Sequence, residues 1–281
     1  MENQFRKALE SGHRLFGTHV NLTDYRVCEM LGGVGFDYLW VDMEHIATSF
    51  SDMERHLIAA KAAGTPCVVR VTWNDIPHIK RVLEAGPDAI VVPMVNSVKE
   101  AQRAIDTCIY PPEGKRGFGP CRAVRYGLDS VKDYIDQGSK QLVRILQVET
   151  KDAVDAMEEV AKIPYVDGFL IGPMDLSGSV GELNHAVDGK KTNRLVDLAI
   201  AKAHAAGPRA RIRPPSWHTG WKRAWISYRP APICGASSAA RKGCWAICGA
   251  CRRSIRASSG GRANERNQYQ TQAQRHAEIL A

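Results

Sequence analysis

Several features that would place the chain in a membrane or outside the cell are missing from it. No run of about 18 consecutive apolar residues occurs, which excludes a membrane-spanning helix. Residues 1–12 are polar and charged, unlike the apolar segment of a secretory signal. The eight cysteines follow no paired framework, and Cys28, Cys67 and Cys108 lie within apolar patterns. We therefore expect a cytoplasmic protein whose thiols are reduced and buried.

Acidic residues are missing from one long stretch near the C-terminus. Pro208–Asn264 contains no Asp or Glu but 12 Lys and Arg residues, together with four of the six tryptophans. From Pro208 onward the local charge is +12, whereas the preceding residues carry −4. No period of 2 or 3.6 residues can be followed through this basic part. We predict a domain over residues 1–206 and a separate basic, Cys/Trp/Arg-rich segment over residues 207–281.

Residues 1–206 alternate between short apolar runs and stretches with helical spacing. The predicted strands are Leu15–Val20, Asp37–Asp42, Pro66–Val71, Asp88–Val92, Leu142–Val148 and Val166–Ile171. The predicted helices are Thr23–Gly33, Ser51–Ala63, Ile76–Ala85, Ser97–Cys108, Lys151–Ala161 and a helical zone ending near Ala206. Six strand–helix units of this kind imply a parallel sheet, because parallel neighbours need a crossover helix. The chain length fits a (β/α)8 barrel of roughly 250 residues.

Polar side chains follow several of these apolar runs directly. Glu44 and His45 come after one strand, and Arg70 lies at the end of the next. Glu149 and Asp175 follow two later strands. In a barrel of alternating strands and helices, catalytic groups come from the C-terminal ends of the strands. A base, a cation and two candidate metal ligands at such positions indicate an enzyme active site.

The long segment Tyr110–Gly127 leaves two interpretations open. It is rich in Pro, Gly and Arg, and a loop of this length in a compact domain is usually functional or disordered. Arg116, Arg122 and Arg125 suit a loop that folds over an anionic ligand. A solvated surface loop is the alternative.

Other polar residues have structural explanations. Asp24 and Asp52 lie at helix starts, where carboxylates cap or stabilise the first turn. Four histidines are expected at the surface, namely His13, His56, His78 and His185.

Six motifs, in order along residues 5–206, resemble one known family. They are Asp42–His45, Val68–Val71, Val91–Val95, Tyr110–Gly117, Gln147–Thr150 and Gly172–Ser177. Together they resemble the metal-dependent class II pyruvate aldolases of the HpcH/HpaI type, which act on 4-hydroxy-2-oxoheptanedioate and 2-keto-3-deoxy-sugar acids. The resemblance implies a (β/α)8 TIM barrel that reversibly cleaves a 4-hydroxy-2-oxo acid to pyruvate and an aldehyde.

The resemblance also implies a set of catalytic groups. Glu149 and Asp175 would hold a divalent cation, and an oxygen-only ligand shell suits Mg or Mn, with Co as a further candidate. Arg70 would place a second positive charge beside the enolate oxygen of pyruvate. His45 would be the acid–base group, because an imidazole titrates near neutral pH. Asp42 or Glu44 would orient that histidine.

Substrate contacts and partners follow from the same resemblance. Gln147 would line the site, and the backbone of Gly172, Pro173, Met174 and Asp175 would take the substrate carboxylate. Trp73, His19 and Arg116 are further candidates to touch the substrate. In relatives, an acidic residue from a neighbouring subunit of the homo-oligomer, usually a hexamer, pairs with the catalytic histidine. Glu84 occupies that position here, although its spacing from Lys80 also suits a helix-surface ion pair.

Two other functions remain as alternatives. One is a lyase or synthase of the phosphoenolpyruvate/pyruvate superfamily acting on a dicarboxylate or acyl-CoA, but citrate-lyase-like members lack the Asp-Xaa-Glu-His pattern of Asp42–His45. The other is a nucleic-acid- or zinc-binding role of the basic segment. Its cysteines, at positions 234, 244, 248 and 251, lack regular paired spacing, so nucleic acid and zinc are not expected partners.

The sequence departs from the family pattern after Ala206. Family members continue with two more strand–helix units, whereas this chain continues with the Arg- and Pro-rich run Pro208–Pro215. Such an acid-free composition resembles GC-rich coding DNA translated in the wrong frame. We hypothesise a frameshift near codon 207, which would leave the last two barrel units missing or scrambled and compromise the oligomer. Resequencing the gene should reveal an intact alternative frame, and its absence would refute the hypothesis.

Overall fold

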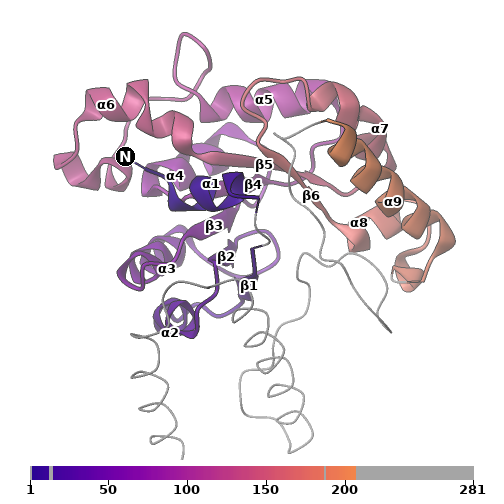
Figure 1. Cartoon of the computed structure of the whole chain (residues 1–281), viewed down its shortest axis with the longest axis horizontal. Helices are drawn as coiled ribbons and strands as arrows, with labels where there is room; N and C mark the ends of the chain where they lie inside the picture. The colour runs from indigo at the N-terminus through magenta and orange to yellow at the C-terminus, as the bar shows by residue number, and fades with distance from the viewer. Residues whose placement is uncertain (1, 13–14, 187, 207–281) are drawn as a thin grey trace, which may run out of the picture. The chain divides into compact units, whose positions relative to one another are not determined.

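The computed structural model describes residues 2–12, 15–186 and 188–206, and the predicted basic segment lies outside these ranges. The described residues form one six-stranded parallel sheet whose strands follow the order of the chain (Figure 1). The strands are β1 (Gly17–Val20), β2 (Tyr38–Asp42), β3 (Cys67–Arg70), β4 (Ala89–Val92), β5 (Val143–Val148) and β6 (Gly168–Ile171). All six predicted strands are confirmed, each to within a few residues.

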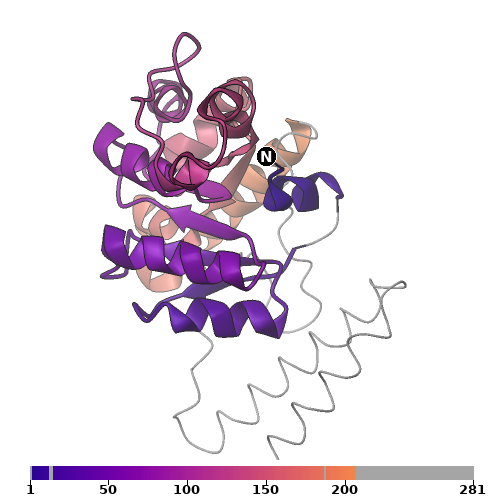
Figure 2. The ribbon, with the colours of Figure 1, turned by 90° about the vertical axis from the view of Figure 1, so that its left-hand side faces the viewer.

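Helices connect these strands and contact one another in sequence (Figure 2). The α-helices are α1 (Gln4–Glu10), α2 (Arg26–Val34), α3 (Phe50–Ala62), α4 (Ile76–Ala85), α5 (Val98–Cys108), α6 (Val131–Asp136), α7 (Lys151–Val160), α8 (Pro173–Ser179) and α9 (Lys190–Ala205). Three 3₁₀ helices are η1 (Arg122–Gly127), η2 (Gly138–Gln141) and η3 (Leu183–His185). Six consecutive β/α units correspond to part of the predicted (β/α)8 barrel. Neither α1 nor α6 is predicted from the sequence.

Side chains at the helix starts explain where several helices begin. Ser49 and Asp52 form a reciprocal capping box at the start of α3, which confirms the role predicted for Asp52. Asp24 accepts a hydrogen bond from the backbone N–H of Arg26 at the first residue of α2. The helix α4 ends at Gly86, whose φ of 71° lies in the left-handed region that glycine adopts without strain.

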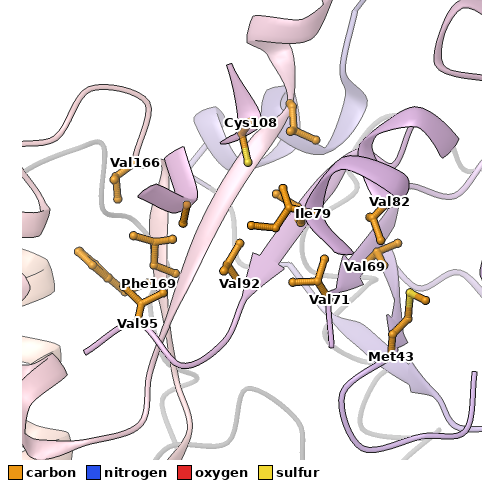
Figure 3. Close-up of a cluster of buried hydrophobic side chains, with 14 of the residues drawn as sticks. Met43, Val69, Val71, Ile79, Val82, Val92, Val95, Cys108, Val166 and Phe169 are labelled. Carbon is orange, nitrogen blue, oxygen red and sulfur yellow. The ribbon is translucent and has the colours of Figure 1, made fainter. Parts of the chain in front are cut away.

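The larger apolar core lies between the sheet and the helices. Leucine, valine and isoleucine side chains from both layers are buried there, and Figure 3 shows Val82 of α4 against Val69 of β3. His56 belongs to this buried face of α3, so its predicted surface position is wrong. Met53, His56, Leu57 and Ala60 are buried together because their spacing places them on one side of the helix.

A second apolar cluster occupies the opposite face of the sheet. Trp40, Val68, Val91 and Ile145 are buried there with Phe5 of α1. These strand residues alternate with those of the larger core, as the two faces of a pleated sheet require. The cluster fills the interior below the C-terminal ends of the strands.

The helix α1 closes the N-terminal ends of the strands. Asn3 donates hydrogen bonds to the carbonyls of Asp88 and Gln141, at 2.7 and 3.0 Å. Arg6 donates to the Leu142 carbonyl at 2.8 Å and to Asp167 Oδ1 at 2.9 Å. Since Asp88, Leu142 and Asp167 each directly precede a strand, α1 is attached to three strand beginnings. The C-terminal ends of the strands are not covered by α1 and are available for a functional site.

The cysteine prediction is confirmed for the three positions it named. Cys28, Cys67 and Cys108 are buried free thiols, and burial raises the pKa of Cys28 to about 12 and that of Cys108 to about 11. Cys121 is exposed. None of the helices in the described ranges has both the length and the apolar character needed to cross a bilayer.

Candidate active site

Charged side chains converge at the C-terminal ends of the strands. Asp42 and Arg70 are the last residues of β2 and β3, and Glu149 directly follows β5. Asp175 lies in the first turn of α8, the helix after β6. Asp42 and Arg70 are neighbours in the β2–β3 register. The structure thus brings these residues together at one edge of the sheet.

Arg70 is the central cation of this cluster. Its Nε and Nη2 atoms donate to the two oxygens of Asp42 at 2.9 and 2.5 Å. Its Nη1 atom lies 2.7 Å from Glu44 Oε2 and donates to Gln147 Oε1 at 3.2 Å. The guanidinium thus reaches from β2 to β5 across the interior of the sheet. Only 6% of Arg70 is exposed, so these contacts fix its position.

Asp42 serves Arg70 as a permanent counter-charge. Burial alone would raise the pKa of Asp42, but the hydrogen bonds and charge of Arg70 hold that pKa below its usual value. Asp42 Oδ1 also accepts a hydrogen bond from the backbone N–H of Glu44 at 2.9 Å. This bond orients the turn that carries Glu44 and His45.

Glu44 and His45 form a pair at the edge of the cluster. His45 Nε2 lies 3.6 Å from Glu44 Oε2, and 48% of the histidine side chain is exposed. Burial raises the pKa of Glu44 to about 7; the negative charges of Glu149, Asp42 and Asp175 add to this effect, and Arg70 opposes it. A carboxyl group with a pKa near 7 beside an imidazole is suited to proton transfer.

Glu149 is almost fully buried, with 1% exposure. Its Oε1 accepts a hydrogen bond from the backbone N–H of Met94 at 2.5 Å, and its Oε2 accepts one from Gln147 Nε2. Burial raises the pKa of Glu149, and the nearby charge of Asp175 raises it further against the opposing effect of these hydrogen bonds. Met94 has a φ of 55°, an uncommon conformation for a non-glycine residue. The sequence gives no signal for this backbone donor.

Gly172 brings the chain after β6 against Glu149. A Cβ atom at Gly172 would lie 3.2 Å from Glu149 Cβ and 3.5 Å from Glu149 Oε2. Glycine therefore permits a close approach that a larger residue would obstruct. Pro173 and Met174 then begin α8, which carries Asp175.

The donor set fits a hard divalent cation. Glu149 and Asp175 are two carboxylates that interact electrostatically, and both also raise the pKa of the nearby Glu44. The described ranges contain no group of three or more His, Cys, Asp or Glu residues arranged to hold a metal ion. Two carboxylates from the protein would leave further coordination positions to substrate and water, as oxygen-binding cations such as Mg²⁺ allow. A bound cation would also relieve the repulsion among these carboxylates.

Two predicted residues lie elsewhere within the chain. Glu84, on α4, lies 3.4 Å from Arg116 Nη2 and not beside His45 of the same chain. The side chain of Arg116 is fully buried, donates to Tyr134 Oη at 3.1 Å and packs over the ring of Tyr110 at 4.5 Å. Arg116 therefore attaches the loop to Glu84 of α4 and to Tyr134 of α6.

The other arginines of the Tyr110–Gly127 loop also contact the protein itself. Arg122 Nη1 donates to the carbonyl of Ala85 at 2.5 Å, and Arg125 pairs with Asp129. Most of the loop is exposed, as the solvated-loop interpretation expects, while Arg116 and Arg122 attach it to the protein. Trp73, a further substrate candidate, is half exposed.

Comparisons with known proteins agree with the motif resemblance. The family model described as HpcH/HpaI aldolase/citrate lyase matches residues 15–214. A 4-hydroxy-2-oxo-heptane-1,7-dioate aldolase from Escherichia coli is 35% identical over 207 residues, covering 74% of this chain and 79% of that protein. A hydroxypyruvate/pyruvate aldolase from Roseobacter denitrificans is 34% identical over 185 residues, covering 66% and 72%. A crystal structure of a family protein from Burkholderia cenocepacia J2315 has a TM-score of 0.68 at 30% identity, covering 73% and 82%.

Proposed function

The chain belongs to the HpcH/HpaI aldolase/citrate lyase family, and we propose that it reversibly cleaves a 4-hydroxy-2-oxo acid to pyruvate and an aldehyde. The observation that supports this reaction best is the buried contact network of Arg70. It links Asp42 and Glu44, next to the candidate base, with Gln147, next to the candidate metal ligands. The Arg70 guanidinium can therefore contact both the pyruvate half and the aldehyde half of a small substrate.

Glu149 and Asp175 would hold a divalent cation, Mg²⁺ or Mn²⁺ by the chemistry of their oxygens, with Co²⁺ as a further candidate. When bound, such a cation polarises the carbonyl of a 2-oxo acid. Gln147 would line this half of the site, since it contacts both Arg70 and Glu149. The backbone of Gly172 to Asp175, with Pro173 and Met174, would take the substrate carboxylate.

The side chains near His45 would carry out the proton transfer from the substrate. In cleavage, His45 removes the proton of the 4-hydroxyl group, the C3–C4 bond breaks, and the aldehyde carbonyl forms. The electron pair of that bond remains on the three-carbon fragment as an enolate, whose oxygen Arg70 stabilises. The enolate carbon then takes up a proton and becomes the methyl group of pyruvate. Glu44 would orient His45, while Asp42 holds Arg70 in place.

We also propose a homo-oligomer, with a hexamer expected from the family resemblance. Glu84 would then approach His45 of a neighbouring copy, although within one chain it contacts Arg116. Analytical ultracentrifugation tests the assembly, and a purely monomeric chain would remove this role of Glu84.

The reaction is tested by measuring pyruvate release from 4-hydroxy-2-oxoheptanedioate with added Mn²⁺ or Mg²⁺. We expect release that EDTA abolishes and that either metal restores. Cleavage of an acyl-CoA or of a dicarboxylate without a 4-hydroxy-2-oxo group, in place of this activity, would contradict the proposal. A panel of aldehydes condensed with pyruvate then defines the second substrate.

A further inference from the structure

Asn96, in the loop after β4, contacts the loop that carries Glu149 and has no role in the reaction described so far. Its Oδ1 atom accepts a hydrogen bond from the Thr150 hydroxyl at 2.6 Å. Thr150 directly follows Glu149, and Asn96 lies two residues after Met94, whose backbone N–H donates to Glu149 Oε1. Two hydrogen bonds therefore join the same two loops, one through the candidate metal ligand and one beside it. The strands that precede these loops, β4 and β5, are neighbours in the sheet.

Neither adjacent helix needs the hydrogen bond between Asn96 and Thr150. The helix α5 begins after Ser97, whose side chain accepts from the backbone N–H of Glu100. Asn96 contributes to this helix start with its backbone N–H, which donates to Glu100 Oε2 at 2.8 Å, and not with its side chain. The helix α7 begins after Thr150, whose hydroxyl oxygen accepts from the backbone N–H of Ala153 at 3.1 Å. The Asn96 side chain thus connects two helix starts that are each capped without it.

The backbone conformation of Met94 gives this connection a consequence for Glu149. A φ of 55° is uncommon for a residue with a side chain and persists only where the surrounding structure holds it. Val95, labelled in Figure 3, is buried in the larger apolar core. Asn96 is then held through both its side chain and its backbone. These contacts fix the turn in which the Met94 N–H donates to Glu149.

The orientation of Glu149 matters for a cation, because a preorganised carboxylate loses less freedom when it binds. Each of its oxygens accepts one hydrogen bond, from the Met94 N–H and from Gln147 Nε2. A carboxylate oxygen has two lone pairs, so each oxygen retains one for a metal ion. Removal of groups that orient a metal ligand typically lowers metal affinity by about 10- to 100-fold.

We propose, resting on the metal site of the function above, that Asn96 is a positioning residue which orients Glu149 for the divalent cation. It acts through two neighbours of that carboxylate, the Met94 backbone and the Thr150 hydroxyl. Loss of the Asn96 amide should therefore weaken cation binding even where the chain remains folded.

The test measures the dissociation constant of Mn²⁺ in the full-length chain by electron paramagnetic resonance. The variant Asn96→Leu has nearly the same size but cannot accept the hydrogen bond. We expect the dissociation constant to rise about tenfold, as for other groups that orient a metal ligand. Thr150→Ser, which retains the hydroxyl group, should bind Mn²⁺ as tightly as the unaltered chain. If Asn96→Leu does not fold, Asn96→Ala replaces it.

A double-mutant cycle separates the hydrogen bond from the helix cap. Thr150→Val removes the hydroxyl group, and with it both the contact to Asn96 and the cap of α7. In the Thr150→Val background, Asn96→Leu should raise the dissociation constant by no more than about twofold, because the hydrogen bond is already missing. An equal increase in the two backgrounds would overturn the proposal.

The matched control is Asn3→Leu, because Asn3 also connects the chain at β4 and β5, but at their opposite ends. Its side chain donates to the carbonyls of Asp88 and Gln141, which lie just before these strands. Asn3→Leu should lower the melting temperature and leave the Mn²⁺ dissociation constant unchanged. Equal weakening of Mn²⁺ binding in Asn3→Leu and Asn96→Leu would also overturn the proposal, because general loosening of the sheet would then explain both.

Mn²⁺ binding by the unaltered chain distinguishes failure of this proposal from failure of the proposed function. If the unaltered chain binds Mn²⁺ and Asn96→Leu binds it with the same dissociation constant, the Asn96 proposal alone is overturned. Absence of Mn²⁺ binding in the unaltered chain overturns the proposed metal site and the Asn96 proposal with it.

Discussion

The two ends of the parallel sheet accommodate buried charge in opposite ways. At the N-terminal ends, Arg6 and Arg144 donate to backbone carbonyls that precede β5, and both contact Asp167. At the C-terminal ends, Glu44 and Glu149 are buried beside other carboxylates, and both have raised pKa values. The first arrangement offsets charge with partners and stabilises the fold. The second places one cation, Arg70, among several carboxylates and leaves a net negative charge, which is typical of a site that binds a cation.

The largest effect is expected when the uncompensated carboxylates are removed. In the double variant Glu149→Ala/Asp175→Ala, pyruvate release should fall by a factor on the order of 10³ or more, because the cation is lost together with its contribution to the transition state. A matched control, Glu158→Ala/Asp188→Ala, removes two carboxylates that are 64% and 78% exposed. The control should retain full activity in the same assay. Equal activity in both double variants would contradict the proposed metal ligands.

Removal of Arg70 tests the cation that joins the two halves of the site. Arg70→Ala should lower kcat for pyruvate release about 10²- to 10³-fold, the usual cost of losing a charge-stabilising donor. It should also destabilise the fold by about 3–5 kcal/mol, because Asp42 is left buried without its partner. Arg55→Ala, on an exposed side chain, is the control. Unchanged urea denaturation in Arg70→Ala would show that the buried pair is not stabilising.

The pH dependence of the free energy of unfolding tests whether the pKa of Glu44 is raised. Its pKa is raised from 4.5 to about 7, so the folded state binds this proton more tightly than the unfolded state between those values. The contribution of Glu44 to stability is therefore present below pH 4.5 and is lost as the pH rises to 7. Relative to Glu44→Gln, the metal-free chain should lose up to about 3 kcal/mol across this window. Chemical denaturation in EDTA at several pH values measures the difference in the free energy of unfolding between the unaltered chain and Glu44→Gln. A difference that does not change with pH would refute the raised pKa.

The smallest effect is expected at the opposite end of the sheet. Arg6→Met removes the hydrogen bonds to the Gln141 and Leu142 carbonyls and to Asp167. We expect a loss of about 2 kcal/mol in the free energy of unfolding, because buried acceptors lose their donor. The value of kcat should stay the same, since α1 lies away from the catalytic groups. A large loss of kcat in a folded Arg6→Met chain would show that the two ends do not have separate roles.

The sequence predicted the catalytic end of the sheet better than the opposite end. Arg70, Glu149 and Asp175 could be grouped because the C-terminal ends of parallel strands meet at one edge, whatever the details of packing. The attachment of α1 could not be predicted, because Arg6 and Asp167 are 161 residues apart and their contact depends on the complete sheet. Local patterns contain no information about such a contact.

At single residues, too, the sequence missed contacts that depend on the folded structure. His56 was expected at the surface because histidine is polar, yet the helical spacing that buries Met53 also buries it. Within one chain Glu84 pairs with Arg116, 32 residues away, a contact that neither its motif position nor its spacing to Lys80 indicated. The hydrogen bond from Met94 to Glu149 uses a backbone N–H, which every residue except proline possesses.

The central claim is that Glu149 and Asp175 together hold one divalent cation. Titration of the full-length chain with Mn²⁺, followed by electron paramagnetic resonance, measures this directly. We expect one bound Mn²⁺ per chain, and loss of this binding in the nearly isosteric variant Glu149→Gln/Asp175→Asn. Undiminished Mn²⁺ binding in that folded variant would contradict it.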